Sequence, residues 1–302
     1  MKYIVFGAGG FLGKKLAGYL REQGDEVIAV VHKQPASYNV DITAADSFQS
    51  LNGITDASIV INCASFLPDA SLPVNDVVYL KNLFETNVIG AINILNFAAQ
   101  KNIKRVINCS TLAVVNKPWP VPLKETDAIY PKGTHIGYCL SKLSQELIMN
   151  EVAIRAGVAV LHLRLSALYG PGMKWQGIMP MLIDKALKNE TIQLTNAQKV
   201  SFDFLFIDDL LHIIRHLSQT TEWKECIINV ASGEEVFLRD LAEIIIRQTN
   251  SSSSMEFYTN DQVFSRSVVD ISLLKSMLKN QFSFTSIKDG IRSTISSLSD
   301  LN

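Results

Sequence analysis

Tyr138 and Lys142 are the two residues whose types and spacing point most directly to catalysis. They are separated by one helical turn in a stretch of helical apolar spacing, so both side chains lie on one face. A tyrosine hydroxyl ionises near pKa ~10, and an adjacent ammonium is expected to lower that pKa by roughly 1–3 pH units. Such a pair can exchange a proton with a carbinol oxygen while hydride moves to or from a nicotinamide. The alternative is an ordinary Tyr/Lys pair on an exposed helix.

A hydroxyl that would complete this pair follows the predicted strand Arg105–Cys109, which runs into Ser110 and Thr111. The carboxyl end of a strand in a parallel sheet is where a substrate is bound. Thr111 is our first choice for the substrate hydrogen bond, and Ser110 is the reserve. Either hydroxyl can instead cap the following turn.

A glycine-rich loop stands at the start of the chain, between a predicted strand and a predicted helix. Gly7 permits a tight turn, Gly10 lets the backbone approach a pyrophosphate, and Gly13 lets the helix pack on the sheet. Phe11 and Leu12 open the helix, where unpaired N–H groups and the helix dipole favour an anion. A plain turn with spare glycines is the alternative, but the position between strand and helix favours dinucleotide binding.

The end of the second predicted strand bears on the choice of coenzyme. An acidic residue there would bind the ribose 2′-hydroxyl of NAD, and the chain has His32 and Lys33 instead. Lys33, assisted by His32, can pair with a 2′-phosphate, so NAD(P) binding with a preference for NADP is expected. Both side chains can also simply be solvated. Asp41, before Ile42, is a candidate acceptor for the adenine amino group, or a surface residue of a turn.

The order of predicted elements gives the fold class. Short apolar runs alternate with stretches of helical periodicity, which predicts an α/β doubly wound parallel sheet, the Rossmann fold. The predicted strands are Tyr3–Phe6, Glu26–Val31, Ser58–Asn62, Arg105–Cys109 and Val158–Arg164. The predicted helices are Leu12–Gln23, Leu83–Lys101 and Ile136–Ala156.

After Arg164 the alternation breaks, and Gly170-Pro171-Gly172 indicates a loop. A helix is expected at Trp175–Lys188, and Phe204–Ile207 and Ile227–Val230 are expected as strands that rejoin the first sheet. We therefore predict a dinucleotide-binding domain at 1–168, rejoined by about 201–232. Residues 169–200 and 233–302 are predicted to form a small C-terminal α/β substrate-binding lobe.

Composition narrows the functional classes. The formal net charge is −1 and basic residues are scattered, which argues against nucleic acid and acidic membranes as partners. No apolar run has the length of a membrane span, and a signal peptide is not expected. The four cysteines form no Cys-x-x-Cys pair and the five histidines no metal cluster, so we expect a cytoplasmic protein with reduced thiols and no metal.

These residues together resemble the extended short-chain dehydrogenase/reductase family, also called the NAD-dependent epimerase/dehydratase family. The resemblance runs through nearly the whole chain and implies a nicotinamide domain and a C-terminal lobe that commonly holds a nucleotide-activated sugar. It implies Thr111, Tyr138 and Lys142 as catalytic triad, with Lys142 also on the nicotinamide ribose. The motifs that carry it are Gly7/Gly10/Gly13, Asp41-Ile42, Asn62-Cys63-Ala64-Ser65, Asn87-Val88-Ile89-Gly90, Ser110-Thr111, Tyr138-x-x-x-Lys142, Tyr169-Gly170-Pro171-Gly172, Asp208-Asp209 and Asn229-Val230-Ala231-Ser232-Gly233.

From these motifs Cys63, Ala64, Ser65 and Asn87 join the expected coenzyme contacts. The expected substrate contacts are Ser65, Thr111, Tyr169 and Arg266. For Tyr169 the alternative is a structural turn, and for Arg266 it is a surface arginine.

Departures from the family pattern narrow the chemistry. Leu112-Ala113 follows Thr111 where dehydratases have acidic residues, which argues against dehydration. Ala167 and Phe202 replace an Asn and an Arg that family members commonly use for the diphosphate. The substrate is therefore either a sugar nucleotide held differently or a smaller carbonyl compound.

Two reactions share the triad, epimerisation with retained NAD and reduction of a 4-keto sugar by NADPH, and both stay open. A non-catalytic dinucleotide sensor is a further alternative, although such proteins usually lose the Tyr or the Lys. A homodimer is expected through Leu83–Lys101 and Ile136–Ala156, whose apolar faces can equally be ordinary core.

Overall fold

The computed structural model describes residues 1–34, 38–69, 71–73, 75–115, 117–129, 135–220, 223, 226–261 and 266–299. By compactness the chain divides into two units, each made of several segments. The first comprises Met1–Asn116, Ala128–Arg164 and Ile214–Ile228. The second comprises Lys117–Asp127, Leu165–Ile213 and Asn229–Asn302.

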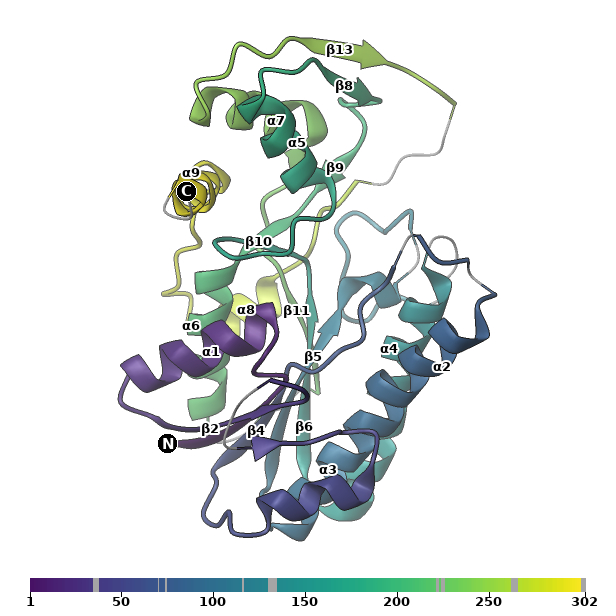
Figure 1. Ribbon diagram of the computed structural model, residues 1–302, viewed down its shortest axis with the longest axis vertical. Helices are drawn as coiled ribbons and strands as arrows, with labels where there is room; N and C mark the ends of the chain where they lie inside the picture. The colour runs from purple at the N-terminus through teal and green to yellow at the C-terminus, as the bar shows by residue number, and fades with distance from the viewer. Residues whose placement is uncertain are drawn as a thin grey trace. The chain divides into compact units, whose positions relative to one another are not determined.

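A twisted sheet of seven strands in the described part of the chain organises the first unit (Figure 1). The pairs β1–β2, β1–β4, β4–β5 and β2–β3 are all parallel. This order is the one expected for a doubly wound sheet, and it confirms the predicted fold class. The order is β11 (Ile227–Val230), β6 (Ala159–Leu165), β5 (Arg105–Thr111), β4 (Ile59–Asn62), β1 (Lys2–Phe6), β2 (Glu26–Val31) and β3 (Tyr38–Asn39).

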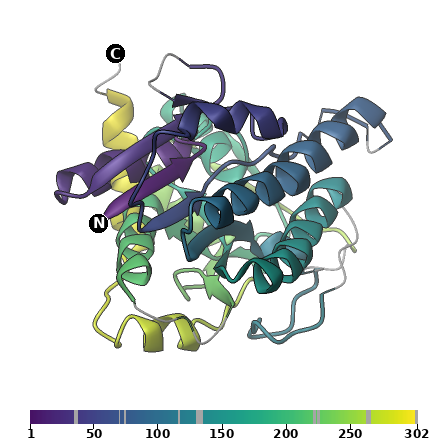
Figure 2. The same ribbon diagram turned by 90° about the horizontal axis from the view of Figure 1, so that it is seen from below.

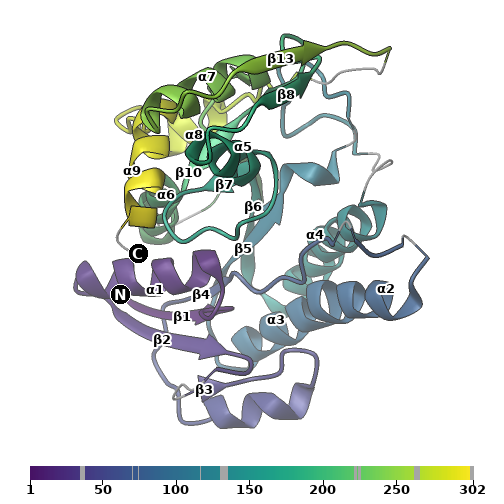
Figure 3. The ribbon, with the colours of Figure 1, turned by 45° about the horizontal axis from the view of Figure 1, so that its top comes forward.

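Helices cover both faces of this sheet because the strands are apolar on both sides. Ile4 and Phe6 belong to a core that includes Ile94 and Leu95 of α3 (Gly90–Gln100). Strand residues alternate between faces, so Tyr3 and Val5 point to the opposite side, where α1 (Phe11–Glu22) packs on β1 and β2. Figure 3 shows α1 and α3 on opposite sides of these strands.

The helix predicted at Leu83–Lys101 begins earlier than expected. The structure has α2 (Val77–Phe84), a π-helical turn at Glu85–Ile89 and then α3. Asp76 caps α2 by accepting a hydrogen bond from the Tyr79 N–H at 2.9 Å. Helix α2 lies beside α4 (Figure 2). Helix α4 spans Ile136–Ala156, as predicted. Two short 3₁₀ helices complete the unit, at Ala45–Leu51 and Leu112–Val114.

The second unit differs from the prediction in two places. Phe204–Phe206 (β10) does not rejoin the main sheet; it pairs with β7 (Ala167–Tyr169), whereas Ile227–Val230 does rejoin as β11. The helix expected from Trp175 begins at Ile178, after Gly177 with φ 95°. The other elements are α5 (Ile178–Leu187), β8 (Ile192–Thr195), β9 (Ser201–Phe202), α6 (Ile207–Gln219), β12 (Val236–Phe237), α7 (Leu238–Gln248), β13 (Met255–Tyr258), α8 (Ser272–Met277) and α9 (Ile287–Ser299).

Within the described ranges, no helix has both the length and the hydropathy needed to cross a membrane.

Candidate active site

The hydroxyl group of Tyr138 meets two other hydroxyls. Tyr138 lies in the first turn of α4, Ser65 follows β4, and Thr111 ends β5. Ser65 and Thr111 both lie close enough to the Tyr138 hydroxyl for hydrogen bonding to lower the pKa of the phenol. The carboxyl ends of two neighbouring parallel strands and the start of one helix therefore converge on one phenol, within the first unit.

The pKa of Tyr138 moves opposite to the sequence-based expectation. Burial raises it to about 12, because the phenolate would be desolvated, and hydrogen bonding with Ser65 and Thr111 offsets only part of this. The expected lowering by the Lys142 ammonium is wrong for this structure, since Lys142 is not among the charges that act on the phenol. Tyr138 is consequently a protonated phenol at neutral pH.

Lys142 is buried, with 1% of its surface exposed. In the described part of the chain its ammonium donates to the Cys109 carbonyl oxygen at 2.8 Å and to Oε1 of Gln145 at 2.5 Å. Burial lowers the pKa of Lys142 to about 8, and the nearby Glu146 carboxylate acts in the opposite direction. The side chain therefore remains mostly charged at neutral pH and loses its charge at mildly alkaline pH.

Behind Lys142 lies a chain of buried amides. Gln145 Oε1 also accepts from Asn108 Nδ2 at 3.0 Å, and Gln145 Nε2 donates to the Asn87 carbonyl at 2.6 Å. Asn108 Oδ1 accepts a hydrogen bond from Asn62 Nδ2 at 2.9 Å. Asn62 is the last residue of β4, and it is in register with Asn108 of β5. Each of these groups is at most 1% exposed, so the orientation of Gln145 is fixed from three sides.

This chain ends on a neutral histidine. Asn108 Nδ2 also lies 3.0 Å from Nδ1 of His162, and Nε2 of His162 lies 3.0 Å from Oδ1 of Asn150. Because an amide nitrogen only donates, Nδ1 is assigned as acceptor and Nε2 as the protonated nitrogen. Burial lowers the pKa of His162 to about 4, which agrees with a neutral ring.

The neighbouring Ser110 has a different partner from Thr111. Its hydroxyl donates to Oε1 of Glu146 at 2.5 Å, and Glu146 forms a buried ion pair with Arg164 of β6, with Nη2 to Oε2 at 2.8 Å. Both charged side chains are 1% exposed. Ser110 is thus engaged in the interior, and Thr111 is the hydroxyl that faces Tyr138.

The glycine loop has the close backbone packing that a dinucleotide site needs. Gly7 has φ 75°, and a Cβ there would lie 2.6 Å from the Ala64 nitrogen. A Cβ on Gly13 would lie 2.2 Å from the Gly7 carbonyl oxygen. Gly10 stands at the N-cap of α1, which has no side-chain cap and no acid in its first turn. The N–H groups at the start of α1, including those of Phe11 and Leu12, fit a pyrophosphate.

At the end of β2 lie the residues that are expected to distinguish NADP from NAD. His32 and Lys33 are exposed, and Nε2 of His32 lies 3.7 Å from Oδ2 of Asp41. Oδ1 of Asp41 accepts hydrogen bonds from both the N–H and the hydroxyl of Thr43. Asp41 therefore has the role of a turn residue, which the sequence offered as the alternative to binding the adenine amino group. These hydrogen bonds, together with the nearby His32 and Lys33 side chains, hold the pKa of Asp41 below its usual range.

Several predicted coenzyme contacts serve to position the loops. Asn87 is fully buried; it accepts from Ser65 Oγ and the Phe66 N–H, and it donates to Ser141 Oγ at 2.9 Å. Ile42 packs so closely on Gly90 that a Cβ there would lie 2.6 Å away. Cys63 and Cys109 place their sulfur atoms 3.8 Å apart at the ends of β4 and β5.

The two predicted substrate contacts of the second unit have structural partners. Tyr169 is 2% exposed, with its ring packed on Phe204 and Phe206, so the structure does not bring it to a ligand-facing position. Arg266 forms a bidentate ion pair with Glu235, through Nε at 2.9 Å and Nη2 at 2.5 Å.

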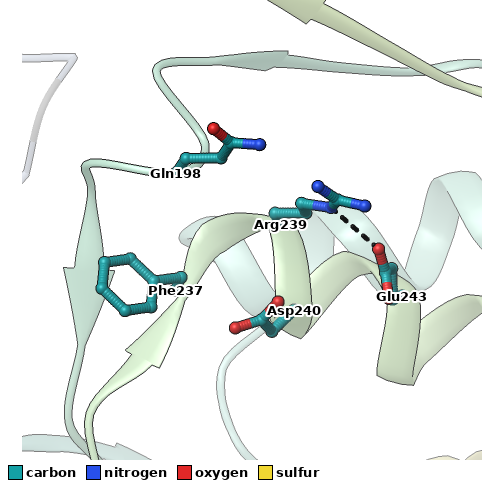
Figure 4. Close-up of a pocket in the computed structure, with 5 residues that line it drawn as sticks. All are labelled: Gln198, Phe237, Arg239, Asp240 and Glu243. Atoms are coloured by element: carbon teal, nitrogen blue, oxygen red, sulfur yellow. Dashed lines mark hydrogen bonds and ion pairs between the residues drawn. The ribbon is translucent and has the colours of Figure 1, made fainter.

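A separate pocket of the second unit is shown in Figure 4. None of the predicted site residues lines it. Two of its lining residues, Arg239 and Glu243, form an ion pair at 2.9 Å. Its lining residues are Gln198, Phe237, Arg239, Asp240 and Glu243.

Sequence reasoning missed the residues that hold Lys142 and Ser110. Gln145 and Glu146 lie on α4 one turn beyond Lys142, and Asn108 and His162 lie in buried stretches of β5 and β6. A polar residue in the middle of a buried strand needs a partner, and that signal would have found Asn108 and His162. Gln34 was also missed; its Nε2 donates to the Gly9 carbonyl at 3.3 Å.

Comparisons with known proteins identify the family and the fold. Residues 3–231 match the NAD dependent epimerase/dehydratase family. The chain is 26% identical over 296 residues to a GDP-6-deoxy-D-talose 4-dehydrogenase of Aggregatibacter actinomycetemcomitans, with 95% of each chain covered. Its fold is similar to RMD from Pseudomonas aeruginosa complexed with NADPH (TM-score 0.84, 21% identity, 100% and 99% covered). It is also similar to UDP-glucose 4-epimerase of Thermus thermophilus in complex with NAD (TM-score 0.80, 20% identity, 99% of each covered). The chain belongs to the NAD-dependent epimerase/dehydratase family, and it is an NAD(P)-dependent enzyme of the extended short-chain dehydrogenase/reductase type.

Proposed function

We propose that the protein catalyses oxidoreduction at a secondary alcohol or ketone carbon of a nucleotide-activated sugar, with Tyr138 as the acid/base residue. The observation that carries the proposal is the convergence of Ser65 and Thr111 on the Tyr138 hydroxyl. Three hydroxyls at one point can bind a single carbonyl or carbinol oxygen, and only the phenol has acid–base chemistry suited to the reaction. The relative named as a GDP-6-deoxy-D-talose 4-dehydrogenase supports the substrate class.

Reduction of a keto sugar is the direction that the site favours. A phenol with a pKa of about 12 is protonated at neutral pH, so Tyr138 is ready to donate to a carbonyl oxygen that becomes an alcohol. When bound, the nicotinamide coenzyme supplies the hydride for this reaction. Thr111 and Ser65 hold the oxygen in line with Tyr138, and the buried Lys142 ammonium provides positive charge for the ribose hydroxyls.

The coenzyme is proposed to be NADP. Lys33 is a cation at the end of β2, beside His32, where a 2′-phosphate would be bound, and Asp41 is occupied by Thr43. The fold neighbour complexed with NADPH is compatible with this choice. A sugar-nucleotide epimerase with retained NAD is the competing reaction, and a fold neighbour of that description binds NAD.

The substitution Tyr138→Phe tests the proposal. Purified protein is assayed for NADPH oxidation with 4-keto-6-deoxy sugars activated by UDP, dTDP, GDP and CDP. We expect turnover with at least one of them and a loss of kcat of about 10²- to 10⁴-fold in the variant, with NADPH binding retained. Unchanged activity of Tyr138→Phe would exclude Tyr138 as the acid, and absence of turnover with every substrate would favour a non-catalytic coenzyme-binding protein. Interconversion of sugar nucleotides without net coenzyme consumption would instead identify an epimerase.

We also propose that the protein is a homodimer that pairs through α2 and α4. Leu140, Leu147 and Ile154 are spaced by two helical turns on α4 and are 39%, 59% and 78% exposed. Val77 and Val78 on the adjacent α2 are 75% and 68% exposed. An exposed apolar stripe on two neighbouring helices is the usual form of a helix-pairing surface.

A further inference from the structure

Cys63 and Cys109 lie beside each other at the carboxyl edge of the main sheet, within the first unit. Asn62 of β4 is in register with Asn108 of β5, and the residue after each of them is a cysteine. The Cys63 N–H still donates to the Phe6 carbonyl at 3.0 Å, so the strand geometry continues through this position. Both thiols therefore lie on the face opposite the two asparagine amides, and their sulfur atoms are 3.8 Å apart.

The backbone at these two positions has the spacing that a disulfide needs. Neighbouring strands are about 4.8 Å apart, and the Cα atoms joined by a disulfide are usually about 4.4–6.8 Å apart. The sulfur atoms would have to approach from 3.8 Å to about 2 Å, which needs only local adjustment of the two residues. Both cysteines are half-buried, whereas Cys139 is buried, so a small oxidant can approach this pair.

The two cysteines also adjoin the groups that are expected to bind the coenzyme. A Cβ on Gly7 would lie 2.7 Å from the carbonyl carbon of Cys63, so the glycine loop packs directly on this residue. On the other strand, the Cys109 carbonyl oxygen accepts a hydrogen bond from the Lys142 ammonium at 2.8 Å. Close-packed groups transmit displacements, so drawing the two cysteines together should disturb the glycine loop and Lys142.

We propose that Cys63 and Cys109 are a redox-sensitive thiol pair that a peroxide oxidises to a disulfide, and that this disulfide and a bound nicotinamide coenzyme oppose each other. The coupling rests on the coenzyme site of the proposed function, whereas formation of the disulfide does not depend on it. Linkage is reciprocal, so a disulfide that weakens coenzyme binding is disfavoured by the same factor when the coenzyme is bound.

Hydrogen peroxide supplies the two-electron oxidation. A hydrogen bond with Cys109 and burial hold the pKa of the Cys63 thiol well above its usual range, against the opposing charge of Lys142, so we assign the first step to Cys109. Its thiolate attacks one peroxide oxygen, the O–O bond breaks, and a sulfenic acid forms while the other oxygen takes up the thiol proton and leaves as water. The Cys63 sulfur then attacks the sulfenic sulfur, the S–S bond forms as the S–O bond breaks, and the oxygen leaves with the Cys63 proton as a second water. A dithiol reductant restores both thiols.

Peroxide treatment followed by peptide mass spectrometry tests the thiol pair. The full-length protein and its variants Cys63→Ser, Cys109→Ser and Cys226→Ser are reduced, freed of reductant and treated with a small molar excess of hydrogen peroxide. Remaining thiols are blocked before digestion without reduction. Cys226 is the matched control, because it is an exposed cysteine of the same unit. Thermal melting checks that each variant is folded.

We expect a cross-link between the Cys63 and Cys109 peptides, with the loss of a hydrogen from each thiol, in the unsubstituted protein and in Cys226→Ser. Dithiothreitol should remove it, and Cys63→Ser and Cys109→Ser should lack it. Free thiols at both positions after treatment, or a sulfinic acid at either one without the cross-link, would overturn the thiol pair.

Calorimetric titration with NADP⁺ measures the coupling, because peroxide does not oxidise this form of the coenzyme. We expect the disulfide form to bind NADP⁺ about 5- to 150-fold more weakly than the dithiol form, with recovery after dithiothreitol. Saturating NADP⁺ should in turn slow formation of the cross-link. Equal affinity of the two forms would overturn the coupling. Absence of NADP⁺ binding to the reduced protein would instead contradict the proposed coenzyme, and the cross-link would still decide the thiol pair.

Discussion

Oε1 of Gln145 accepts a hydrogen bond from the Lys142 ammonium at 2.5 Å, and the same oxygen accepts another from Asn108. Lys142 and Gln145 are one turn apart on α4. The contact directs the Lys142 ammonium, which is expected to bind the ribose, towards the buried Gln145 amide and not towards the Tyr138 phenol. Lys142 and Tyr138 therefore have separate electrostatic surroundings, although they share one helix face. Their two titrations should be separable by substitution.

Activity is expected to fall as pH rises through about 8, where Lys142 loses its proton. Gln145→Glu places a carboxylate beside the ammonium and raises the pKa of Lys142, so this alkaline limb should move to higher pH. Gln145→Leu removes an acceptor, and the limb should move to lower pH. The pH dependence of kcat/KM for both variants measures the shift. A purely structural role of Gln145 would reduce activity equally at every pH in both variants.

Glu146→Gln should destabilise the fold strongly, because Arg164 would remain charged and buried without the Glu146 carboxylate. Loss of one member of a buried ion pair costs about 3–5 kcal/mol. Urea unfolding measures the free energy of unfolding. Glu151→Gln on the same helix is the control, since its partner Arg155 and Glu151 itself are 78% and 61% exposed, and that variant should be close to the unsubstituted protein. Similar stability of the two variants would contradict this view of the Glu146–Arg164 pair.

Lys33→Ala should raise KM for NADPH by about 10- to 100-fold and leave KM for NADH nearly unchanged, because only NADPH carries the 2′-phosphate. Lys104→Ala provides the control, as an exposed lysine just before β5 at the amino edge of the sheet. Steady-state kinetics with both coenzymes makes the comparison. An equal effect on NADPH and NADH would remove the argument for NADP.

Leu147→Glu should convert a dimer into a monomer in sedimentation equilibrium, because it places a charge in the apolar stripe of α4. Leu187→Glu introduces the same change at a leucine that is 49% exposed on α5, and it should leave the mass unchanged. A monomeric mass for the unsubstituted protein at micromolar concentration would contradict the proposed pairing.

The parallel sheet and the glycine loop were predictable from the sequence because each leaves a local pattern, whereas the order of the strands in the sheet does not. The apolar run Tyr3–Phe6, the glycines at 7, 10 and 13 and the helical spacing of Ile136–Ala156 require no knowledge of distant contacts. Residues Thr111, Tyr138 and Lys142 were predicted as site residues from equally local patterns. Phe204–Phe206 was assigned to the wrong sheet, because an apolar run does not specify which strand it pairs with.

The electrostatics of the site were not predictable, since they depend on contacts between residues far apart in the chain. The pKa of Tyr138 is governed by burial and by Ser65 and Thr111, which come from two different strands. The ammonium of Lys142 is directed by Gln145 and by a carbonyl of β5, and neither contact follows from the spacing of Tyr138 and Lys142. Spacing placed the pair on one face, and packing determined what each member touches.

The buried amides also determine where the reaction can obtain its proton. Asn108 Nδ2 donates both towards Gln145 and towards His162, so the hydrogen bonds run outward from one nitrogen in opposite directions. A chain of this polarity offers no one-way path for a proton from Asn150 to Lys142. On the proposed function, Tyr138 would then be reprotonated through Ser65, Thr111 or solvent and not through this chain.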